Sequence, residues 1–297
     1  MGNGTVVVAG ATGMQGRPIL EALRAKGFAP RALTRQAAPD LPEGVASVQG
    51  DLSDTASLRD AFEGADALVL LLPLVFDAAQ VAGYARNAVE AARATGLRRV
   101  VFDTSAPVPD APVGVPAVDV KRAALDVLEG ADLDLTVIRP TIYMGNLAAP
   151  WTAPGIVAER VVAYPLAEGI RCAWITWEDA AACVAAALAD DASVGRSYDV
   201  GGPEALDGMG VAAAFEAARG AAHGYAAVPL DGFEAGLSQA IGPDAGREIA
   251  ALYRWLNAEG AEYLAEGAGG AAALGVEATA MRDWAAHVPW DALAGGA

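Results

Sequence analysis

Histidine, cysteine and lysine, which carry much of enzyme chemistry, are scarce in this sequence. The 297 residues include two histidines, His223 and His287, and two cysteines, Cys172 and Cys183. None of their spacings is typical of a metal site, so we expect no bound metal. Two lone cysteines also make no disulfide framework, and we expect buried thiols in a reducing cytoplasm. The histidines have no acidic partner at helical spacing and are interpreted as structural.

Long apolar runs and positive charge are also missing. No run of about 18 apolar residues occurs, so we expect no membrane span. The N-terminus has no basic region before its apolar run, so we expect no signal peptide and a cytoplasmic protein. Lys and Arg number 20 against 37 Asp and Glu, a formal net charge of −17. This charge argues against nucleic acid and anionic membranes as partners but says little about the substrate. The partners we expect are a small-molecule substrate and, as an open alternative to a monomer, a second copy in a homodimer.

The segment TVVVAGATGMQG, residues 5–16, is the most informative part of the chain. Three valines predict a buried strand, and glycines at the spacing GxxGxxG follow it directly. Glycine permits a tight turn and lets backbone N–H groups approach a pyrophosphate. The helix expected after the turn directs its partial positive end to the same place. This strand–turn–helix context predicts a dinucleotide site. Its expected contacts are Gly10, Thr12, Gly13, Met14, Gln15 and Gly16.

Apolar strands alternate with helical patterns through the first half of the chain. Strands are expected at residues 29–34, 47–49, 67–72, 99–102 and 135–139, and helices at 17–26, 57–62, 76–95 and 121–128. Further on, a capping box at residues 176–179 is expected to start a helix that runs through residue 188. We also expect a strand at 197–200, helices at 210–219, 233–240, 244–258 and 281–286, and a loose loop at 267–273. This alternation predicts an α/β fold, a doubly wound parallel sheet (Rossmann) with a smaller, mainly helical C-terminal lobe.

The end of the second strand bears on which dinucleotide binds. A site built for NAD has an acid there, about 20 residues past the glycines, to bind the ribose hydroxyl. Here the sequence reads Thr34–Arg35–Gln36, and the planar cation of Arg35 suits a 2′-phosphate. We therefore expect NADP(H), although Arg35 is also compatible with a plain surface position. Asp51 follows the third strand and is a candidate for the adenine amine or an ordinary turn residue.

These patterns divide the chain into two expected domains. Residues 1–150 would form an NADP-binding Rossmann core, with strand and helix elements from about 173–203 returning to it. Residues 204–297 would form a C-terminal substrate-binding lobe. The glycine motif lies wholly in the first half, which is the reason to expect the second half to cover the cofactor.

The tyrosine acid of short-chain reductases is absent. Those enzymes carry Tyr-x-x-x-Lys, in which lysine lowers the pKa of the tyrosine. None of the seven tyrosines has lysine four residues later. The chain has only two lysines: Lys26, expected at a helix end, and Lys121, expected to open the helix after the fifth strand. An ammonium at Lys121 would hold the nicotinamide ribose or give a proton to a developing alkoxide; a solvated helix position is the alternative.

Other candidate residues follow the carboxyl ends of the expected strands, where ligands bind in open α/β sheets. A hydroxyl there could bind a substrate oxygen, and a tyrosine could reach the substrate. These candidates are Leu72 and Pro73, Thr104 and Ser105, and Pro140 and Tyr143. With Lys121, the hydroxyls of Tyr143 and Ser105 are the candidate catalytic groups.

Four segments together resemble the NmrA-like branch of the atypical short-chain dehydrogenase/reductases. They are GATGMQGRPILEALRAKGFAPRALTR, GDL at residues 50–52, VKRAALDVLEGADLDLTVIRPTIYMGNL and AALYRWLNAEG. The resemblance implies a Rossmann fold with a small C-terminal lobe, a preference for NADP(H), and a catalytic role for the lysine that matches Lys121. Members include quinone, triphenylmethane-dye and phenylpropanoid reductases, and also regulators that bind the cofactor without turnover.

The sequence thus predicts an NADPH-dependent reductase that transfers hydride to a small carbonyl, quinone or conjugated alkene. Lys121 would stabilise the negative charge that develops on the acceptor. A redox-sensing regulator that reports the NADP(H) ratio to a partner protein is the alternative. A nucleotide-sugar epimerase is disfavoured because Tyr-x-x-x-Lys is missing.

Overall fold

A parallel sheet of seven strands organises the fold in the computed structural model, which describes residues 4–36 and 40–294. The strand order is β3-β2-β1-β4-β5-β6-β8, the order of a Rossmann sheet with one strand added beside β6. The strands are β1 (Thr5–Val8), β2 (Ala29–Thr34), β3 (Ala46–Gln49), β4 (Ala67–Leu71), β5 (Arg99–Asp103), β6 (Asp134–Pro140) and β8 (Ser197–Val200). The predicted doubly wound α/β fold is confirmed.

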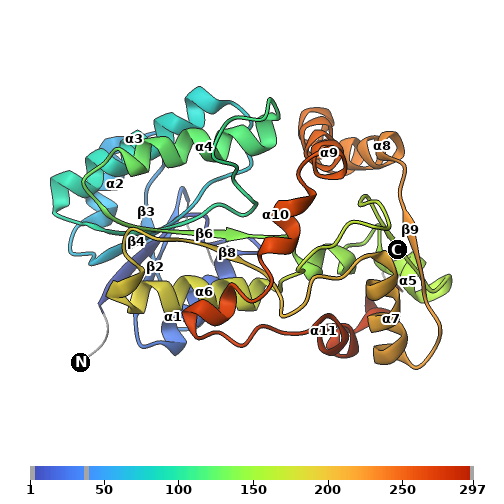
Figure 1. Ribbon diagram of the computed structural model, residues 1–297. Helices are drawn as coiled ribbons and strands as arrows, with labels where there is room; N and C mark the ends of the chain where they lie inside the picture. The colour runs from blue at the N-terminus through green and yellow to red at the C-terminus, as the bar shows by residue number, and fades with distance from the viewer. Residues whose placement is uncertain (1–3, 37–39, 295–297) are drawn as a thin grey trace. The chain divides into compact units, whose positions relative to one another are not determined.

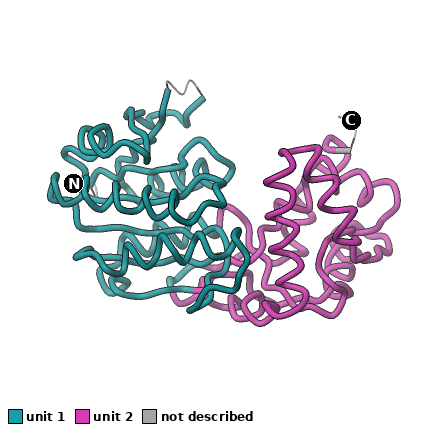
Figure 2. The backbone as a smooth tube through the Cα atoms, turned by 90° about the horizontal axis from the view of Figure 1, so that it is seen from above, with its two compact units in different colours: residues 1–139, 180–198, 274–276 teal, residues 140–179, 199–273, 277–297 magenta. Residues whose placement is uncertain are grey.

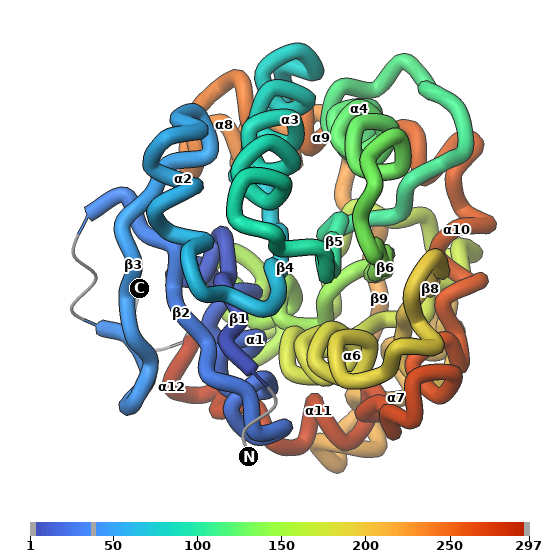
Figure 3. Tube along the Cα trace, turned by 90° about the vertical axis from the view of Figure 1, so that its left-hand side faces the viewer, coloured from blue at the N-terminus to red at the C-terminus, as the bar shows by residue number. Residues whose placement is uncertain are grey.

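Helices cover both faces of this sheet (Figures 1 and 3). On one face lie α2 (Thr55–Phe62), α3 (Ala78–Thr95) and α4 (Pro116–Glu129), and on the other α1 (Gly16–Ala25) and α6 (Trp177–Ala189). Because both faces are covered, the strands are unbroken apolar runs: the three valines of β1 and every residue of β4 are buried. An apolar core joins the sheet to α2, α3 and α4.

The chain forms two compact units, coloured separately in Figure 2. The first comprises residues 1–139, 180–198 and 274–276; the second comprises 140–179, 199–273 and 277–297. In the second unit, β7 (Val161–Tyr164) pairs in parallel with β9 (Gly224–Ala227). Its helices are η1 (Met144–Ala148), α5 (Ala153–Ala158), α7 (Gly208–Arg219), α8 (Leu230–Ile241), α9 (Pro243–Ala258), α10 (Ala261–Glu266), α11 (Met281–His287) and α12 (Trp290–Ala294). Two short 3₁₀ turns complete the chain, η2 (Asp191–Ser193) and η3 (Ala271–Leu274).

The helix that carries Lys121 begins earlier than predicted. Pro116 starts α4, so Lys121 lies inside the helix and does not open it. Proline suits the first turn of a helix because its φ is already helical and its missing N–H would have no partner there. Asp119 further orders this start by accepting the N–H groups of Val113 and Gly114, at 2.8 and 2.9 Å.

The expectation of a loose loop at 267–273 is wrong. Ala271 is buried and begins η3, and the glycines before it approach other backbone closely. A Cβ on Gly270 would lie 1.7 Å from the carbonyl oxygen of Asp199. The glycine-rich composition therefore reflects tight packing. No helix within the described ranges is long and apolar enough to cross a membrane.

Candidate functional site

The first unit contains a cavity of about 1190 Å³ at the carboxyl ends of its strands. Its wall is built from residues that follow β1, β2, β3, β4 and β5, on both sides of the point between β1 and β4 where the strand order reverses. Ligands of open α/β sheets bind at this switch point. Eleven residues singled out in the sequence line it: Gly10, Thr12, Gly13, Met14, Gln15, Arg35, Asp51, Leu72, Pro73, Ser105 and Lys121.

Glycine occupies three positions of the turn, and each position favours it for a different local reason. Gly10 has φ +72°, a conformation that favours glycine. Gly16 lies under the turn, where a Cβ would come within 2.2 Å of the Gly10 carbonyl oxygen and 2.6 Å of the Ala11 Cα. Gly13 lines the cavity, and a Cβ there would meet only the Gly10 oxygen, at 3.4 Å. Gly13 therefore opens the turn toward the cavity, while Gly16 lets α1 pack against the turn.

Charge distinguishes this cavity from the rest of an acidic chain. Three cations line it, Arg17, Arg35 and Lys121, against two carboxylates, Asp40 and Asp51. Their formal sum is +1, although the whole chain carries −17. The cavity is thus a place where an anionic ligand meets local positive charge.

Arg35 and Asp51 both line the cavity, and the charge of Arg35 acts on the Asp51 carboxyl. The Ser53 N–H and hydroxyl donate to Oδ1 of Asp51, at 2.8 and 2.7 Å. These bonds, together with the nearby charge of Arg35, hold the pKa of Asp51 below its usual range. Arg31 lies on β2, the strand that leads to Arg35; it donates to the Glu63 carbonyl at 2.9 Å and is not part of the cavity wall.

A second group of polar residues lies where β5 ends. The Ser105 N–H donates to Oδ1 of Asp103 at 2.8 Å, and the Ser105 hydroxyl donates to Oε1 of Gln15 at 2.8 Å. Ser105 has φ +60°, which is uncommon for a residue with a side chain. Its hydroxyl therefore connects the end of β5 to the glycine turn.

Lys121 and Asp103 form an electrostatically coupled pair. Asp103 is 1% exposed, and burial raises the pKa of its carboxyl to about 6 against the lowering effects of the Ser105 N–H and the charge of Lys121. Burial lowers the pKa of Lys121 to about 8, and the charge of Asp103 opposes that shift. A lysine with a lowered pKa on a cavity wall can donate a proton near neutral pH, which an unperturbed lysine does poorly.

Four predicted site residues do not line this cavity. Gly16 lies beneath the turn. Thr104 is fully buried, and its hydroxyl donates to the carbonyl oxygens of Ala106 and Ile138, at 2.6 and 3.2 Å. Pro140 and Tyr143 belong to the second unit, and Tyr143 is buried with its ring 6.3 Å from that of Trp177. The backbone partners of Thr104 give its side chain a structural role.

Sequence reasoning missed several residues of the cavity wall. Arg17 follows the glycine turn, and its guanidinium donates to the Asp40 carbonyl. Tyr84 accepts a hydrogen bond from the Gln80 amide at 2.7 Å. Leu74 is 62% exposed at the cavity wall. An arginine one position after the last glycine was a usable signal, whereas nothing in the sequence places Tyr84 of α3 at the switch point.

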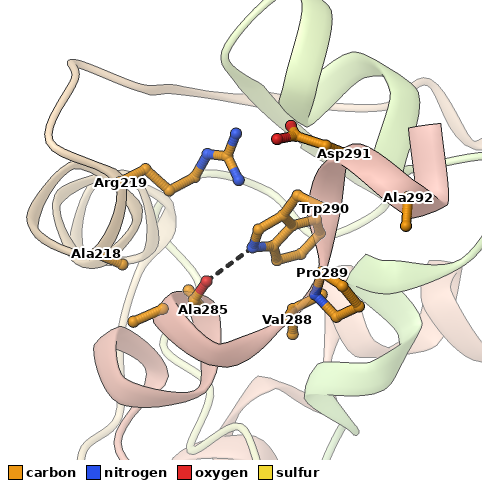
Figure 4. A pocket seen from close by; sticks show the side chains of 9 residues that line it. Ala218, Arg219, Ala285, Val288, Pro289, Trp290, Asp291 and Ala292 are labelled. Carbon is orange, nitrogen blue, oxygen red and sulfur yellow. Dashed lines mark hydrogen bonds between the residues drawn. The ribbon is translucent and has the colours of Figure 1, made fainter. Parts of the chain in front are cut away.

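A second hollow, in the second unit, has a different character (Figure 4). It measures about 570 Å³ and lies between α7, α11 and α12. The Arg219 guanidinium stands 5.8 Å from the centre of the Trp290 ring, whose N–H donates to the Ala285 carbonyl at 2.7 Å. Arg219 and Asp291 are its only ionisable lining residues. It has no glycine turn, so it does not resemble a dinucleotide site.

Histidine and cysteine take no part in the cavity wall. The Nδ1 atoms of His223 and His287 lie 2.7 Å from the backbone oxygens of Ala221 and Asp283. Cys172 and Cys183 are buried, and neither is part of a disulfide bond. Across residues 4–36 and 40–294, no cluster of three or more His, Cys, Asp or Glu is placed to hold a metal ion.

Comparison with known proteins assigns the family. The model of the NmrA-like family matches residues 2–284. The chain belongs to the NmrA-like family. One curated relative of this NmrA-like chain is the NAD(P)H azoreductase of Xenophilus azovorans, 30% identical over 230 residues, which cover 76% of this chain and 78% of the relative.

Solved structures share the NmrA-like fold. The NADPH-dependent quinone oxidoreductase of Escherichia coli, complexed with NADPH, has a TM-score of 0.77 at 22% identity and covers 95% of this chain and 99% of its own. The negative transcriptional regulator NmrA, in complex with NADP, has a TM-score of 0.77 at 19% identity; the match covers 100% of this chain and 99% of the NmrA chain. At these identities the likeness establishes the fold alone.

Proposed function

We propose that this NmrA-like chain is an NADPH-dependent reductase that transfers hydride to a small carbonyl, quinone or conjugated alkene. As a relative of curated reductases it is an NAD(P)H-dependent oxidoreductase. The observation that carries the proposal is one cavity with a glycine turn, Arg35 on its wall and Lys121 with its lowered pKa on the same wall.

The residues present fit a phosphorylated dinucleotide. Gly13 leaves room beside the turn, so backbone N–H groups can meet a pyrophosphate. Arg35 offers a planar cation to a 2′-phosphate where an NAD site would have an acid. Asp51, held ionised by Ser53, is an acceptor for the adenine amine. Leu72 and Pro73 would contact the cofactor from the end of β4.

NADPH would supply the hydride when bound. Lys121 would then donate a proton to, or stabilise, the oxygen that becomes negatively charged on the acceptor. Its pKa of about 8 leaves the amine largely protonated at neutral pH while lowering the cost of giving that proton up. The hydroxyl of Ser105, which also lines the cavity, is a second candidate group for the acceptor, and the hydroxyl of Tyr143 is a third.

A panel of acceptors tests this function. Purified protein would be incubated with NADPH and quinones, aldehydes, enones and azo dyes, the last because of the azoreductase relative. We expect NADPH consumption with at least one acceptor, stoichiometric formation of the reduced product, and much slower consumption of NADH. Tight NADPH binding without consumption by any acceptor would contradict the proposal.

The structural likeness to NmrA gives the alternative function its support. In that case the chain would bind NADP(H) without turnover and report its redox state to a partner protein. A partner protein that binds the chain with one form of the cofactor, NADP⁺ or NADPH, and not with the other would favour the sensor if no acceptor is turned over. Steady turnover would favour the reductase.

A further inference from the structure

A hydrogen bond between Gln15 and Ser105 joins two parts of the cavity wall that are far apart in the sequence. Ser105 follows β5, and its hydroxyl donates to Oε1 of Gln15 at 2.8 Å. Gln15 belongs to the glycine turn after β1, and both residues line the cavity. Strand β4 lies between β1 and β5 in the sheet, so these two strands are about 10 Å apart. The bond therefore spans the carboxyl end of β4.

Local structure holds both ends of this bond. Gln15 occupies the N-cap position of α1, where side chains often accept a helix N–H, yet its side chain makes no such bond. Ser105 has φ +60°, which a residue with a side chain keeps only where surrounding contacts hold it. The Ser105 N–H donates to Oδ1 of Asp103 at 2.8 Å. Ser105 is thus fixed at its backbone and at its hydroxyl.

The direction of the bond decides what Ser105 offers to a ligand. A hydroxyl has one proton and two lone pairs. Because the Ser105 proton is donated to Gln15, its oxygen meets a ligand in the cavity as a hydrogen-bond acceptor. An acceptor suits a ligand group that carries an N–H or an O–H. While the bond is intact, Ser105 cannot protonate a substrate, which leaves that role with Lys121.

The strand order relates Ser105 to one half of the cofactor. Arg35 follows β2 and is the proposed contact of the 2′-phosphate, which belongs to the adenosine half. The glycine turn after β1 is the proposed pyrophosphate site. Next in the sheet come β4 and β5, so the nicotinamide half would lie over the carboxyl ends of these two strands. Ser105 follows β5 and is therefore on the side of the nicotinamide half.

We propose that Ser105 binds the nicotinamide half of the cofactor by accepting a hydrogen bond from it, and that Gln15 is the positioning residue that fixes the Ser105 hydroxyl for this contact. The donor is the carboxamide N–H or a ribose hydroxyl, the donor groups of that half. This role rests on the proposed binding of NADPH in the cavity and does not require turnover. Binding measurements therefore test it apart from the reductase function.

Adenosine 2′,5′-bisphosphate isolates the contribution of the nicotinamide half, because it keeps the 2′-phosphate and one 5′-phosphate and lacks that half. Calorimetric titration would measure its affinity and that of NADPH for the wild-type protein, Ser105→Ala and Gln15→Leu. Each variant should bind NADPH about three- to tenfold more weakly, the usual worth of one hydrogen bond, and should bind the bisphosphate as the wild type does. An equal loss for both ligands, or no loss for NADPH, would overturn the proposal.

A double-mutant cycle tests whether the two residues act as one unit. If Gln15 acts by fixing the Ser105 hydroxyl, the protein with both Gln15→Leu and Ser105→Ala should bind NADPH no more weakly than Ser105→Ala alone. Losses that multiply would contradict the positioning role of Gln15. If Ser105→Ala does not fold, Gln15→Leu still gives the comparison of NADPH with the bisphosphate.

Two further variants separate the hydroxyl from other effects. Ser105→Gly removes the hydroxyl and suits a φ of +60°, so it should lose as much NADPH affinity as Ser105→Ala. Wild-type NADPH affinity in Ser105→Gly would overturn the contact. Thr95→Val is the matched control, because the Thr95 hydroxyl donates to the Ala91 carbonyl at 3.0 Å and Thr95 does not line the cavity. It should leave both affinities unchanged.

An analogue of the cofactor distinguishes the two possible donors. The 3-acetylpyridine analogue of NADP⁺ has an acetyl group in place of the carboxamide and therefore lacks its N–H. If the carboxamide is the donor, Ser105→Ala should weaken NADP⁺ and leave the analogue unaffected. If a ribose hydroxyl is the donor, Ser105→Ala should weaken both equally. Unchanged affinities for both would overturn the proposal.

The outcomes also separate this contact from the reductase function. If the affinities change as expected but no acceptor is reduced, the reductase proposal fails and the contact of Ser105 with the nicotinamide half stands. If acceptors are reduced but the Ser105 and Gln15 variants bind NADPH as the wild type does, the contact fails and the reductase proposal stands.

Discussion

Arg17, Arg35 and Lys121 share one cavity but differ in their surroundings. Arg35 is exposed at the end of β2, where solvent access suits a contact to a mobile phosphate. Arg17 donates to the Asp40 carbonyl and is partly engaged by the protein itself. Lys121 is half-buried and coupled to an acid, which suits proton transfer. Similar formal charges therefore support different roles.

Arg35→Ala is expected to weaken NADPH binding far more than NADH binding. Loss of a phosphate-pairing arginine should cost roughly 1.5–3 kcal/mol, or about ten- to a hundredfold in affinity. Fluorescence titration with both cofactors measures this. Arg31→Ala is the control, because Arg31 lies on β2, the strand that leads to Arg35, and bonds to the Glu63 backbone. An equal loss for NADPH and NADH would remove Arg35 from the phosphate site.

Lys121→Ala should reduce turnover by about a hundredfold or more, equivalent to ~3 kcal/mol of transition-state stabilisation. Cofactor affinity should fall less, because the pyrophosphate and 2′-phosphate contacts lie elsewhere. Lys121→Arg should restore little, since a guanidinium does not give up its proton near neutral pH. Single-turnover kinetics would separate the two effects. Normal turnover by the alanine variant would transfer the role of proton donor to Ser105, Tyr143 or water.

The pKa of Lys121 also predicts a pH dependence. The protonated amine is the active form if Lys121 donates the proton, and its pKa is lowered to about 8. The rate of reduction should therefore be level below pH 8 and fall as the pH rises through that value. A pH profile of kcat at saturating NADPH checks this sign. A rate that rises through pH 8 would mean that the neutral amine is the active form.

The glycine turn shows how one element combines folding and binding. Gly13→Val should leave a folded protein and abolish NADPH binding, because the added side chain projects into the cavity, where its Cβ meets only one backbone oxygen. Gly16→Val should instead lower the melting temperature, because its Cβ would lie 2.2 Å from a backbone oxygen. Thermal unfolding and cofactor titration of both variants form one experiment. A folded Gly13→Val protein with normal NADPH affinity would rule out this turn as the cofactor site.

The start of α6 offers a test of stability at a residue that does not line the cavity. The Asp179 N–H donates to the Thr176 hydroxyl at 3.0 Å, as the predicted capping box requires. Thr176→Val removes the acceptor at nearly constant volume and should destabilise the protein by about 0.5–2 kcal/mol. Thr176→Ser keeps the acceptor and should cost less. Denaturant unfolding of the two variants measures the difference, and equal stabilities would show that the cap contributes nothing.

Elements with strong local signals were predictable from the sequence. Buried strands such as β4 are continuous apolar runs, and α3 ends at Gly96, whose φ of +76° is a left-handed helix cap. The β7–β9 pair was missed because each strand has four residues and the partners lie about sixty residues apart. The start of α4 was placed late because its first turn carries few helix-favouring residues.

The candidate site was predictable only where a motif encodes it. The glycine turn follows from its motif, Arg35 from its place after the second strand, and Lys121 from the scarcity of lysine. All of these residues line the cavity except Gly16, the last glycine of the turn. The coupling of Asp103 to Lys121 depends on two elements meeting in space, which no periodicity reports. An acid directly after the apolar residues Val100–Phe102 was the one available signal.

Across the whole chain, the described chemistry concentrates in the first unit. The second unit has a buried polar group of its own: the Tyr164 and Tyr253 hydroxyls lie 2.5 Å apart, and the Asn146 amide donates to Tyr164 at 3.2 Å. Burial raises the pKa of both tyrosines, so both stay protonated at neutral pH. Substrate binding by residues 204–297 stays a prediction.

A balanced reaction measured on the intact protein decides between reductase and sensor. Anaerobic incubation with NADPH and each acceptor would be followed by the loss of NADPH absorbance and by quantification of the reduced product. We predict one equivalent of two-electron-reduced product for each NADPH consumed, at a rate that falls at least a hundredfold in Lys121→Ala, or ~3 kcal/mol. Tight NADPH binding with no product from any acceptor, or equal rates for the two proteins, would contradict the assignment of Lys121 as the catalytic group of a reductase.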